Sequence, residues 1–279
     1  HRIFRNSGVS ADGTEIYLDT DWLTSLQSTA YSDRITWIEN AYEFIDQPGE
    51  WYLNRSESKL YYKPDGSMDG KSATLPVTEQ LLVFEGTENI TFDGVKFEDT
   101  SWLTPNEIGY NDAQSGTYAQ HNGVWGDVPG AIETHAAKNI TITNSELCNL
   151  GGGGIRIGNG SSDCAITNSA IHDISSSGIF IGNNTGHNHG YCDPGTDVTG
   201  VVVRNNYITR TGLDIFGSSA ICALYTSDTV IDHNEVCYTT YTGISLGWGW
   251  DWKNAPCSGN NTVSNNYIHD TGKTIHDGG

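Results

Sequence analysis

Two residues near the end of the chain, His276 and Asp277, have the side-chain types and the spacing for acid–base chemistry. They stand in the motif HDGG, residues 276–279. A carboxylate at this position could serve as the acid or the nucleophile of glycoside cleavage, a reaction that usually needs two carboxyl groups about 5–10 Å apart. His276 would then position Asp277 or tune its pKa. The alternative interpretation is that HDGG forms a tight turn without a chemical role.

A tryptophan-rich segment is a second candidate for function. In GISLGWGWDWKN, residues 243–254, Trp248 and Trp250 alternate with glycine and aspartate, which fits neither a helix nor a core strand. Exposed indole rings stack on the apolar faces of sugar rings, so this segment favours contact with carbohydrate. An aromatic loop around Trp125 would wall the same groove. The alternative is that the tryptophans only cover the loop.

Four further residues are candidates for lining that groove: Glu133, His135, Arg156 and Ser245. Short strands of the form G-I-x-I-G place their two apolar residues inward and the middle residue outward. Arg156, Phe180 and Ser245 would therefore form one outward column, with Glu133 and His135 on the same face one coil earlier. Neighbouring coils about 4.8 Å apart would bring Glu133 within ion-pairing range of Arg156. The alternative is an ordinary solvated surface pair.

Metal or cofactor chemistry has little support in the sequence. His187 and His189 have H-x-H spacing, but a glycine-rich loop with two incidental histidines explains them better than a metal site does. We therefore expect no metal and no cofactor.

An internal repeat predicts how the chain positions these candidate residues relative to one another. A short β-branched run followed by Asn or His and a further apolar residue recurs at intervals of 24 to 37 residues. The equivalent bend positions are Asn144, Asn168, Asn205, His233 and Asn265. This pattern predicts an all-β right-handed parallel β-helix over residues 85–279, with these side chains hydrogen-bonded in a ladder from coil to coil. A β-propeller would need longer repeats with tight hairpins.

Residues 1–84 lack the repeat and are predicted to form a small β-rich lobe, with a hairpin around NRSES at residues 54–58. At the other end, Gly278 and Gly279 occupy the position where the next strand should open. A β-helix that stops in mid-coil exposes unpaired backbone groups. We therefore expect the polypeptide to continue, or another subunit to cover the end coil.

Composition narrows the partners and the compartment. A net charge of −20 with only 14 Lys and Arg residues argues against nucleic-acid binding, and no apolar run is long enough to cross a membrane. The six cysteines form no CxxC pair, which disfavours zinc and favours disulfides, with weak preference for sequence-adjacent pairing: Cys148, Cys164, Cys192, Cys222, Cys237 and Cys257. Six N-x-S/T sequons are candidate glycosylation sites: Asn54, Asn89, Asn139, Asn159, Asn183 and Asn260. Cysteines and sequons together favour a secreted, extracellular glycoprotein.

Several long segments carry a resemblance to a known family, among them PVTEQLLVFEGTENITFDGVKFEDTSWL, PGAIETHAAKNITITNSEL, YTGISLGWGW and NNYIHDTGKTIHDGG. The sequence resembles the secreted right-handed parallel β-helix proteins similar to glycoside hydrolase family 141. The resemblance implies α-L-fucosidase or xylanase activity on plant-type polysaccharides. It also implies that the coil continues past HDGG and that an acidic partner for Asp277 lies about one coil downstream.

The resulting prediction is a glycoside hydrolase-like protein that acts on, or binds, an extracellular polysaccharide in a groove along one parallel sheet. The alternative from another class is a non-catalytic extracellular structural glycoprotein that assembles through exposed β-helix ends. A polysaccharide lyase or pectinase has less support, because no Ca²⁺-type aspartate cluster is evident.

Overall fold

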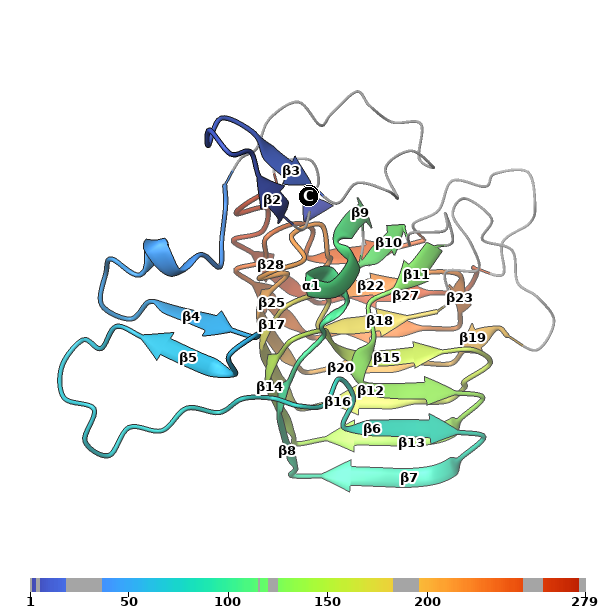
Figure 1. Ribbon diagram of the computed structural model, residues 1–279. Helices are drawn as coiled ribbons and strands as arrows, with labels where there is room; N and C mark the ends of the chain where they lie inside the picture. The colour runs from blue at the N-terminus through green and yellow to red at the C-terminus, as the bar shows by residue number, and fades with distance from the viewer. Residues whose placement is uncertain are drawn as a thin grey trace. The chain divides into compact units, whose positions relative to one another are not determined.

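The computed structural model describes residues 2–3, 6–18, 37–114, 116–119, 125–182, 196–247 and 258–275. Contacts divide the chain into two compact units, Leu26–Leu75 and a larger unit that joins His1–Ser25 to Pro76–Gly279. The larger unit contains a right-handed parallel β-helix, as the repeat predicted (Figure 1). Its first parallel strand begins at Leu82.

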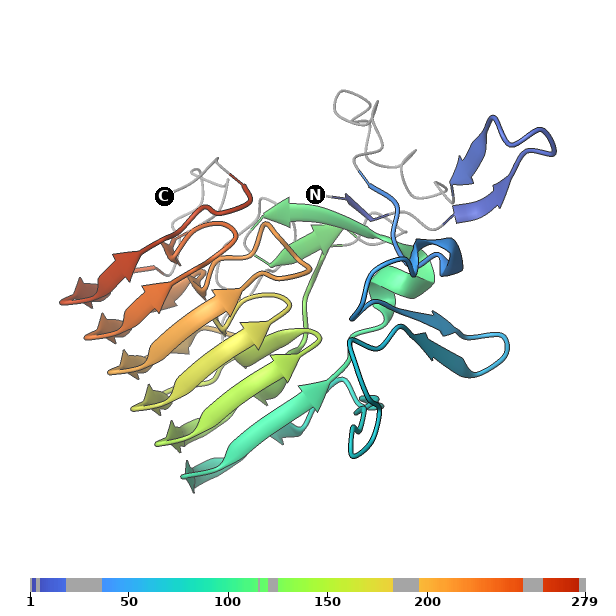
Figure 2. The same cartoon turned by 90° about the vertical axis from the view of Figure 1, so that its left-hand side faces the viewer.

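Each coil of the β-helix contributes one strand to each of three six-stranded parallel sheets. The first sheet comprises β6 (Leu82–Glu85), β12 (Gly130–His135), β15 (Gly153–Gly158), β18 (Ile179–Ile181), β22 (Ile221–Ala223) and β26 (Ile244–Leu246). The second comprises β7 (Glu88–Asp93), β13 (Lys138–Thr143), β16 (Ala165–Thr167), β20 (Val202–Arg204), β24 (Val230–Asp232) and β27 (Thr262–Ser264). The third comprises β8 (Lys96–Thr100), β14 (Glu146–Leu150), β17 (Ala170–Ile174), β21 (Tyr207–Thr211), β25 (Glu235–Cys237) and β28 (Tyr267–His269). Figure 2 shows the third sheet facing the viewer, from teal at the bottom to red at the top.

The remaining elements lie outside these three sheets. Helix α1 (Thr104–Ile108) and strands β9 (Tyr110–Gln114), β10 (Thr117–Ala119) and β11 (Trp125–Asp127) are inserted between β8 and β12, and with β1 (Arg2–Ile3) the three strands form an antiparallel sheet. Strands β2 (Asn6–Val9) and β3 (Ile16–Leu18) form a hairpin, and β19 (Val198–Thr199) pairs with β23 (Thr226–Ser227). The smaller unit contains a 3-10 helix, η3 (Tyr42–Phe44), and the predicted hairpin of β4 (Trp51–Asn54) and β5 (Lys59–Tyr62).

The core of the β-helix is built from the inward-facing apolar residues of stacked strands. In the first sheet, Ile132, Ile155, Ile179 and Ile221 lie in register on successive coils, and each is at most 1% exposed. Burying each such side chain contributes about 1.5–3 kcal/mol. A single coil has no partner for these side chains, so the stacking of coils supplies the core.

A left-handed backbone bend connects each second-sheet strand to the third-sheet strand that follows it. The bend residues all have positive φ: Gly94 (69°), Asn144 (49°), Asn168 (51°), Asn205 (56°), His233 (53°) and Asn265 (52°). Asn and His tolerate this conformation better than most side chains do, and Gly adopts it without strain. The bend positions predicted from the repeat are therefore confirmed, and the backbone conformation explains the residue types.

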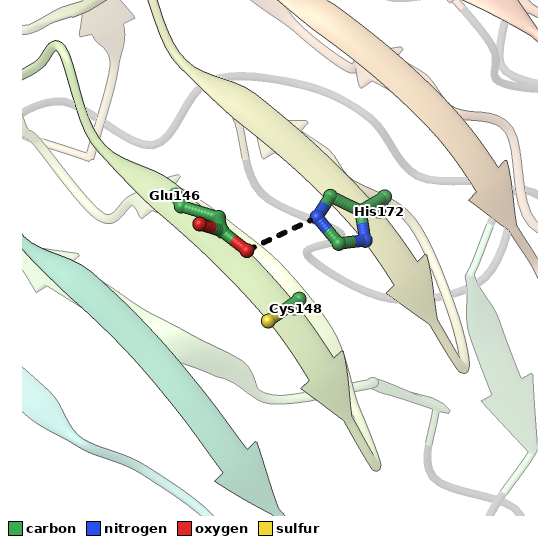
Figure 3. A group of neighbouring side chains, drawn as sticks. All are labelled: Glu146, Cys148 and His172. Atoms are coloured by element: carbon green, nitrogen blue, oxygen red, sulfur yellow. Dashed lines mark ion pairs between the residues drawn. The ribbon is translucent and has the colours of Figure 1, made fainter.

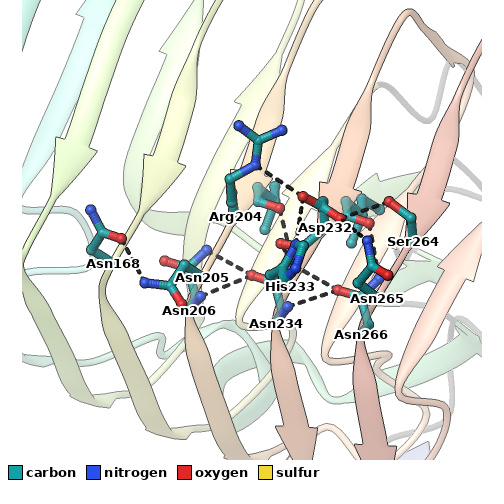
Figure 4. Close-up of polar contacts among 12 residues, drawn as sticks. Asn168, Arg204, Asn205, Asn206, Asp232, His233, Asn234, Ser264, Asn265 and Asn266 are labelled. Atoms are coloured by element: carbon teal, nitrogen blue, oxygen red, sulfur yellow. Dashed lines mark hydrogen bonds and ion pairs between the residues drawn. The ribbon is translucent and has the colours of Figure 1, made fainter.

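The ladder itself was predicted one residue too early. Among the described residues, only Asn168 and Asn205 of the predicted set are bonded to each other, through Asn205 Nδ2 and Asn168 Oδ1 at 2.8 Å. The continuous ladder uses the residue after the bend and is buried at all of its positions but the last, Asn266: Ser145, Ser169, Asn206, Asn234 and Asn266. Figure 4 shows its upper part. The residue after the bend points inward, where backbone N–H groups need acceptors, whereas the bend residue points outward.

A second left-handed residue interrupts or follows each third-sheet strand. It is Asp99, Asn149, Asp173, Arg210, Tyr238 or Asp270, with φ between 49° and 65°. In β17 this bend lets Ile171 and Ile174 both enter the core, each at 0% exposure, although they are three residues apart. It also leaves His172 and Asp173, which are adjacent in sequence, together on the outer surface.

Candidate functional site

The first sheet carries the predicted column of outward-facing residues. The strand registers align Glu133 with Arg156, Arg156 with Phe180, Phe180 with Cys222 and Cys222 with Ser245. The prediction that Arg156, Phe180 and Ser245 share one column is confirmed. At a spacing of about 4.8 Å per coil, three coils place Ser245 about 14 Å from Arg156.

Charged groups gather at the lower end of this column. Arg156 Nη1 lies 3.0 Å from Glu133 Oε1, and Arg156 Nη2 pairs with Asp127 of β11. Gln80 Nε2 donates to Glu133 Oε2 at 2.7 Å, and His135 Nε2 lies 3.2 Å from Glu133 Oε1. The predicted ion pair of Glu133 and Arg156 is confirmed. The alternative of a solvated pair is wrong, because the Glu133 side chain is 6% exposed and the Arg156 side chain 13%.

The buried cluster of Glu133, Arg156 and Asp127 has a structural role. Asn159 Nδ2 donates to His135 Nδ1 at 3.0 Å, so the His135 ring presents its Nε2–H to Glu133. Arg156 pairs with two carboxylates through Nη1 and Nη2, whereas its buried Nε makes no hydrogen bond, and its guanidinium also lies 5.5 Å from the Phe180 ring centroid. Removing one partner of such a buried pair typically costs about 3–5 kcal/mol. The cluster therefore ties β11 to the first sheet, and both oxygens of the Glu133 carboxylate are held by donors.

The upper part of the column changes from buried to partly exposed. Phe180 and Cys222 pack with Leu224 in a small apolar cluster, whereas Ser245 is partly exposed and its neighbour Leu246 is 40% exposed. Four of the predicted site residues lie outside the described part of the chain: Trp248, Trp250, His276 and Asp277. The last described residue before Asp277 is Ile275, whose backbone N–H donates to Thr240 O at 2.9 Å.

A second polar network lies at the bend between the second and third sheets (Figure 4). Asp232 accepts hydrogen bonds from Ser264 Oγ at 2.7 Å, Asn265 Nδ2 at 3.0 Å and Arg204 Nε at 3.1 Å, and it lies 2.8 Å from His233 Nδ1. The Ser264 hydrogen bond, followed by those of His233 and Asn265, holds the pKa of Asp232 well below its usual range. This carboxylate stays ionised and links three coils, so it is suited to holding the stack and not to donating a proton.

Sequence reasoning missed Gln80 and Asp127 in the first-sheet cluster. Both belong to segments outside the repeat, so no periodic signal points to them. It also missed two groups on the third sheet in which Glu, Cys and His donors converge, the only such groups found among the described residues. Their signal is the repeated pair of short motifs E-x-C and I-H-D.

The cysteines correct one prediction. Cys148, Cys164 and Cys237 are buried free thiols, so the sequence-adjacent pair Cys148–Cys164 does not form. The two residues belong to different faces of the coil, because Cys148 lies in β14 and the Cys164 thiol faces Ser162 O at 3.4 Å. Cys222 is buried in the first-sheet column. Cys192 and Cys257 lie outside the described residues.

The sequon asparagines have structural roles of their own. Asn89, Asn139, Asn159 and Asn260 have positive φ, and Asn139 Nδ2 donates to Asn89 Oδ1 at 2.8 Å. Asn54 Oδ1 accepts from Ser56 Oγ in the β4–β5 turn, and Asn183 lies outside the described residues. Glycosylation at these six positions stays a prediction.

Comparison with known proteins places this architecture in a family. The family model described as right handed beta helix region matches residues 130–278. The chain belongs to this family. A solved glycoside hydrolase structure matches with a TM-score of 0.77 and 28% sequence identity, over 84% of this chain and 45% of that one. This β-helix chain thus spans less than half the length of that structure.

A solved alginate lyase from Paenibacillus sp. overlaps with a TM-score of 0.30 and 16% identity, over 66% of this chain and 74% of the lyase. No curated protein matches the sequence. Within the described ranges, no helix combines the length and the apolar character that crossing a bilayer requires.

Proposed function

We propose that this chain is part of a carbohydrate-active enzyme of the glycoside hydrolase type, which binds a polysaccharide along the outward face of the first sheet. The observation that carries the proposal is the match to a glycoside hydrolase over 84% of the chain at 28% identity. A β-helix alone does not determine an activity, because one fold hosts many functions. The location is supported at the upper end of the outward column, where Ser245 is partly exposed, whereas Glu133, Phe180 and Cys222 lower in the column are buried.

Asp277 is the proposed catalytic carboxylate, with His276 as its positioning residue. Residues 272–275 run beside residues 239–241, through hydrogen bonds that include Gly272 N to Tyr241 O and Ile275 N to Thr240 O. Asp277 follows Ile275 by two residues and lies outside the described part of the chain. The second carboxylate that hydrolysis requires would follow about one coil later, as the family resemblance implies.

Substrate recognition is assigned to the upper end of the column. Trp248 and Trp250 directly follow β26 in sequence, and Ser245 and Leu246 of that strand are partly exposed. Indole rings there would stack on sugar rings, and the buried cluster around Arg156 would keep β11 in place as one wall. Fucosylated polysaccharides and xylan are the proposed substrates, and the proposed setting is extracellular.

The test is release of reducing ends from fucosylated polysaccharides and from xylan by the natural full-length polypeptide. Asp277→Asn keeps the side-chain size and should lower kcat by about 10²–10⁴-fold. Asp69→Asn alters an exposed turn residue of the smaller unit and should leave turnover unchanged. Trp248→Ala should raise KM more than it lowers kcat. Full turnover in the Asp277→Asn protein would remove Asp277 from the mechanism, and absence of activity on all glycans would refute the proposal as a whole.

A further inference from the structure

The outer surface of the third sheet carries the same three donor types twice. Glu146 and Cys148 lie two residues apart on β14, and His172 of β17 lies directly opposite Cys148 (Figure 3). Three coils further along, Glu235 and Cys237 of β25 face His269 of β28 in the same arrangement. In each group the carboxylate oxygen, the thiol sulfur and a ring nitrogen lie within 4.8 Å of one another.

Each histidine is oriented by the aspartate that follows it. His172 Nδ1 lies 2.7 Å from Asp173 Oδ2, and His269 Nδ1 lies 2.9 Å from Asp270 Oδ2. The left-handed conformation of Asp173 and Asp270 brings each carboxylate onto the same face as its histidine. A carboxylate that accepts the Nδ1 proton leaves the Nε2 lone pair free, which is the arrangement found behind most metal-binding histidines.

The Nε2 atoms point toward the glutamates at distances that fit a shared ion. His172 Nε2 lies 3.4 Å from Glu146 Oε1, and His269 Nε2 lies 3.5 Å from Glu235 Oε1. A tetrahedral zinc ion with bonds of about 2.0–2.1 Å to nitrogen and oxygen separates those two atoms by about 3.4 Å. His269 Nε2 is buried and makes no hydrogen bond. An ion between His269 Nε2 and Glu235 Oε1 would give this nitrogen a closer partner than the 3.5 Å ion-pair contact to Glu235.

The donor set also fits the ion's charge and chemistry. One carboxylate and one thiolate balance a divalent cation, and a neutral imidazole completes three protein ligands, with the fourth position left to water or another group. The cysteine of each group is buried, at 2% exposure for Cys148 and 1% for Cys237, whereas the glutamate is about half exposed and leaves a path for entry.

We propose that the third sheet binds Zn²⁺ at two equivalent positions, one held by Glu146, Cys148 and His172 and the other by Glu235, Cys237 and His269. Each ion bridges two adjacent coils, so binding stabilises the stack. The proposal is independent of the glycoside hydrolase function and concerns a different sheet.

The two positions differ in the neighbouring groups that compete with Zn²⁺ for the ligand atoms. Lys96 Nζ lies 3.7 Å from Glu146 Oε1 and 2.6 Å from Glu98 Oε2, so a positive charge already neighbours the first position. The corresponding residues of the coil preceding the second position are Tyr207 and Thr209, which are uncharged and contact the Cys237 thiol only through neutral hydroxyls, at 3.8 and 3.5 Å. The second position should therefore bind Zn²⁺ more tightly.

The experiment counts the zinc retained by the full chain. EDTA-stripped protein is loaded with Zn²⁺, desalted, and measured for bound metal and for its unfolding midpoint. Two equivalents are expected, with Zn²⁺ and not Mg²⁺ raising the midpoint. Cys148→Ser and Cys237→Ser should each remove one equivalent, the double variant should remove both, and Cys164→Ser, a buried thiol outside both groups, should retain two. Asp270→Asn should weaken binding at the second position about 10–100-fold.

Co²⁺ provides a direct probe of the sulfur ligand. The wild-type protein with Co²⁺ should show a thiolate-to-cobalt charge-transfer absorption that the double variant lacks. Glu235→Gln changes an exposed side chain and should weaken Co²⁺ binding at least tenfold, which keeps the test valid if a cysteine variant misfolds. Absence of retained zinc, or zinc that persists in the double variant, overturns the proposal. One equivalent removed only by Cys237→Ser supports the second position and overturns the first.

Discussion

Replacing Asn234 by Ala tests whether the buried ladder holds the coils together. Asn234 is 1% exposed; its Nδ2 donates to Val203 O at 3.0 Å and to Asn266 Oδ1 at 2.9 Å. Its Oδ1 accepts from Asn206 N at 3.0 Å and from Asn206 Nδ2 at 2.9 Å. The alanine variant would leave at least Asn206 N and Val203 O buried without these partners. At about 1–3 kcal/mol for each orphaned group, plus the lost side-chain bonds, we expect a loss of about 3–5 kcal/mol.

Equilibrium urea unfolding and thermal melting measure this loss, which should lower Tm by about 10 °C in a chain of this size. The matched control is Asn168→Gly, which removes one exposed link, from Asn205 Nδ2 to Asn168 Oδ1, and keeps the left-handed bend without strain. It should cost less than about 1 kcal/mol. If Asn234→Ala costs no more than Asn168→Gly, the ladder does not stabilise the stack and the reasoning fails.

Two further predictions concern the backbone and the pH dependence of stability. Gly182→Ala should destabilise by about 3 kcal/mol or more, because its φ is +97° and the new Cβ would lie 1.6 Å from Leu224 O. Gly247→Ala, at φ +78° with no atom within 4 Å, should cost only about 1–2 kcal/mol, and equal thermal shifts would contradict the argument. The hydrogen bond from Arg210 lowers the pKa of Asp173 from 3.8 to about 2. Between these two pH values the folded state binds fewer protons than the unfolded state, so the free energy of unfolding falls as the pH drops from about 4 to about 2. Asp173→Asn should flatten the fall of the urea midpoint between about pH 4 and pH 2, and parallel curves for the two proteins would count against this assignment.

The candidate site divides into parts that sequence reasoning reached and parts that it missed. The alignment of Arg156, Phe180 and Ser245 followed from strand alternation and stacking, so it was predictable. The burial of the Glu133–Arg156 pair was not, since it depends on Asp127 from an insertion outside the repeat.

The ladder and the cysteines show a second limit. A repeat identifies equivalent positions, but whether the bend residue or its successor faces inward depends on the backbone conformation at the bend. The ladder therefore runs through Asn206 and Asn234, one residue later than predicted. The sequence spacing of the cysteines likewise did not indicate that Cys148 and His172 lie opposite each other on adjacent strands, because stacking brings together residues from different coils.

The sequence by itself determined the architecture: apolar residues at alternating positions and Asn or His at recurring bends are consequences of local backbone geometry, which each short segment carries within itself. Only the tertiary structure decided which side chains meet. The spacing between equivalent positions of successive coils varies from 24 to 37 residues. Lateral neighbours such as Cys237 and His269, or Asp127 and Arg156, therefore become apparent only when the coils are stacked in register.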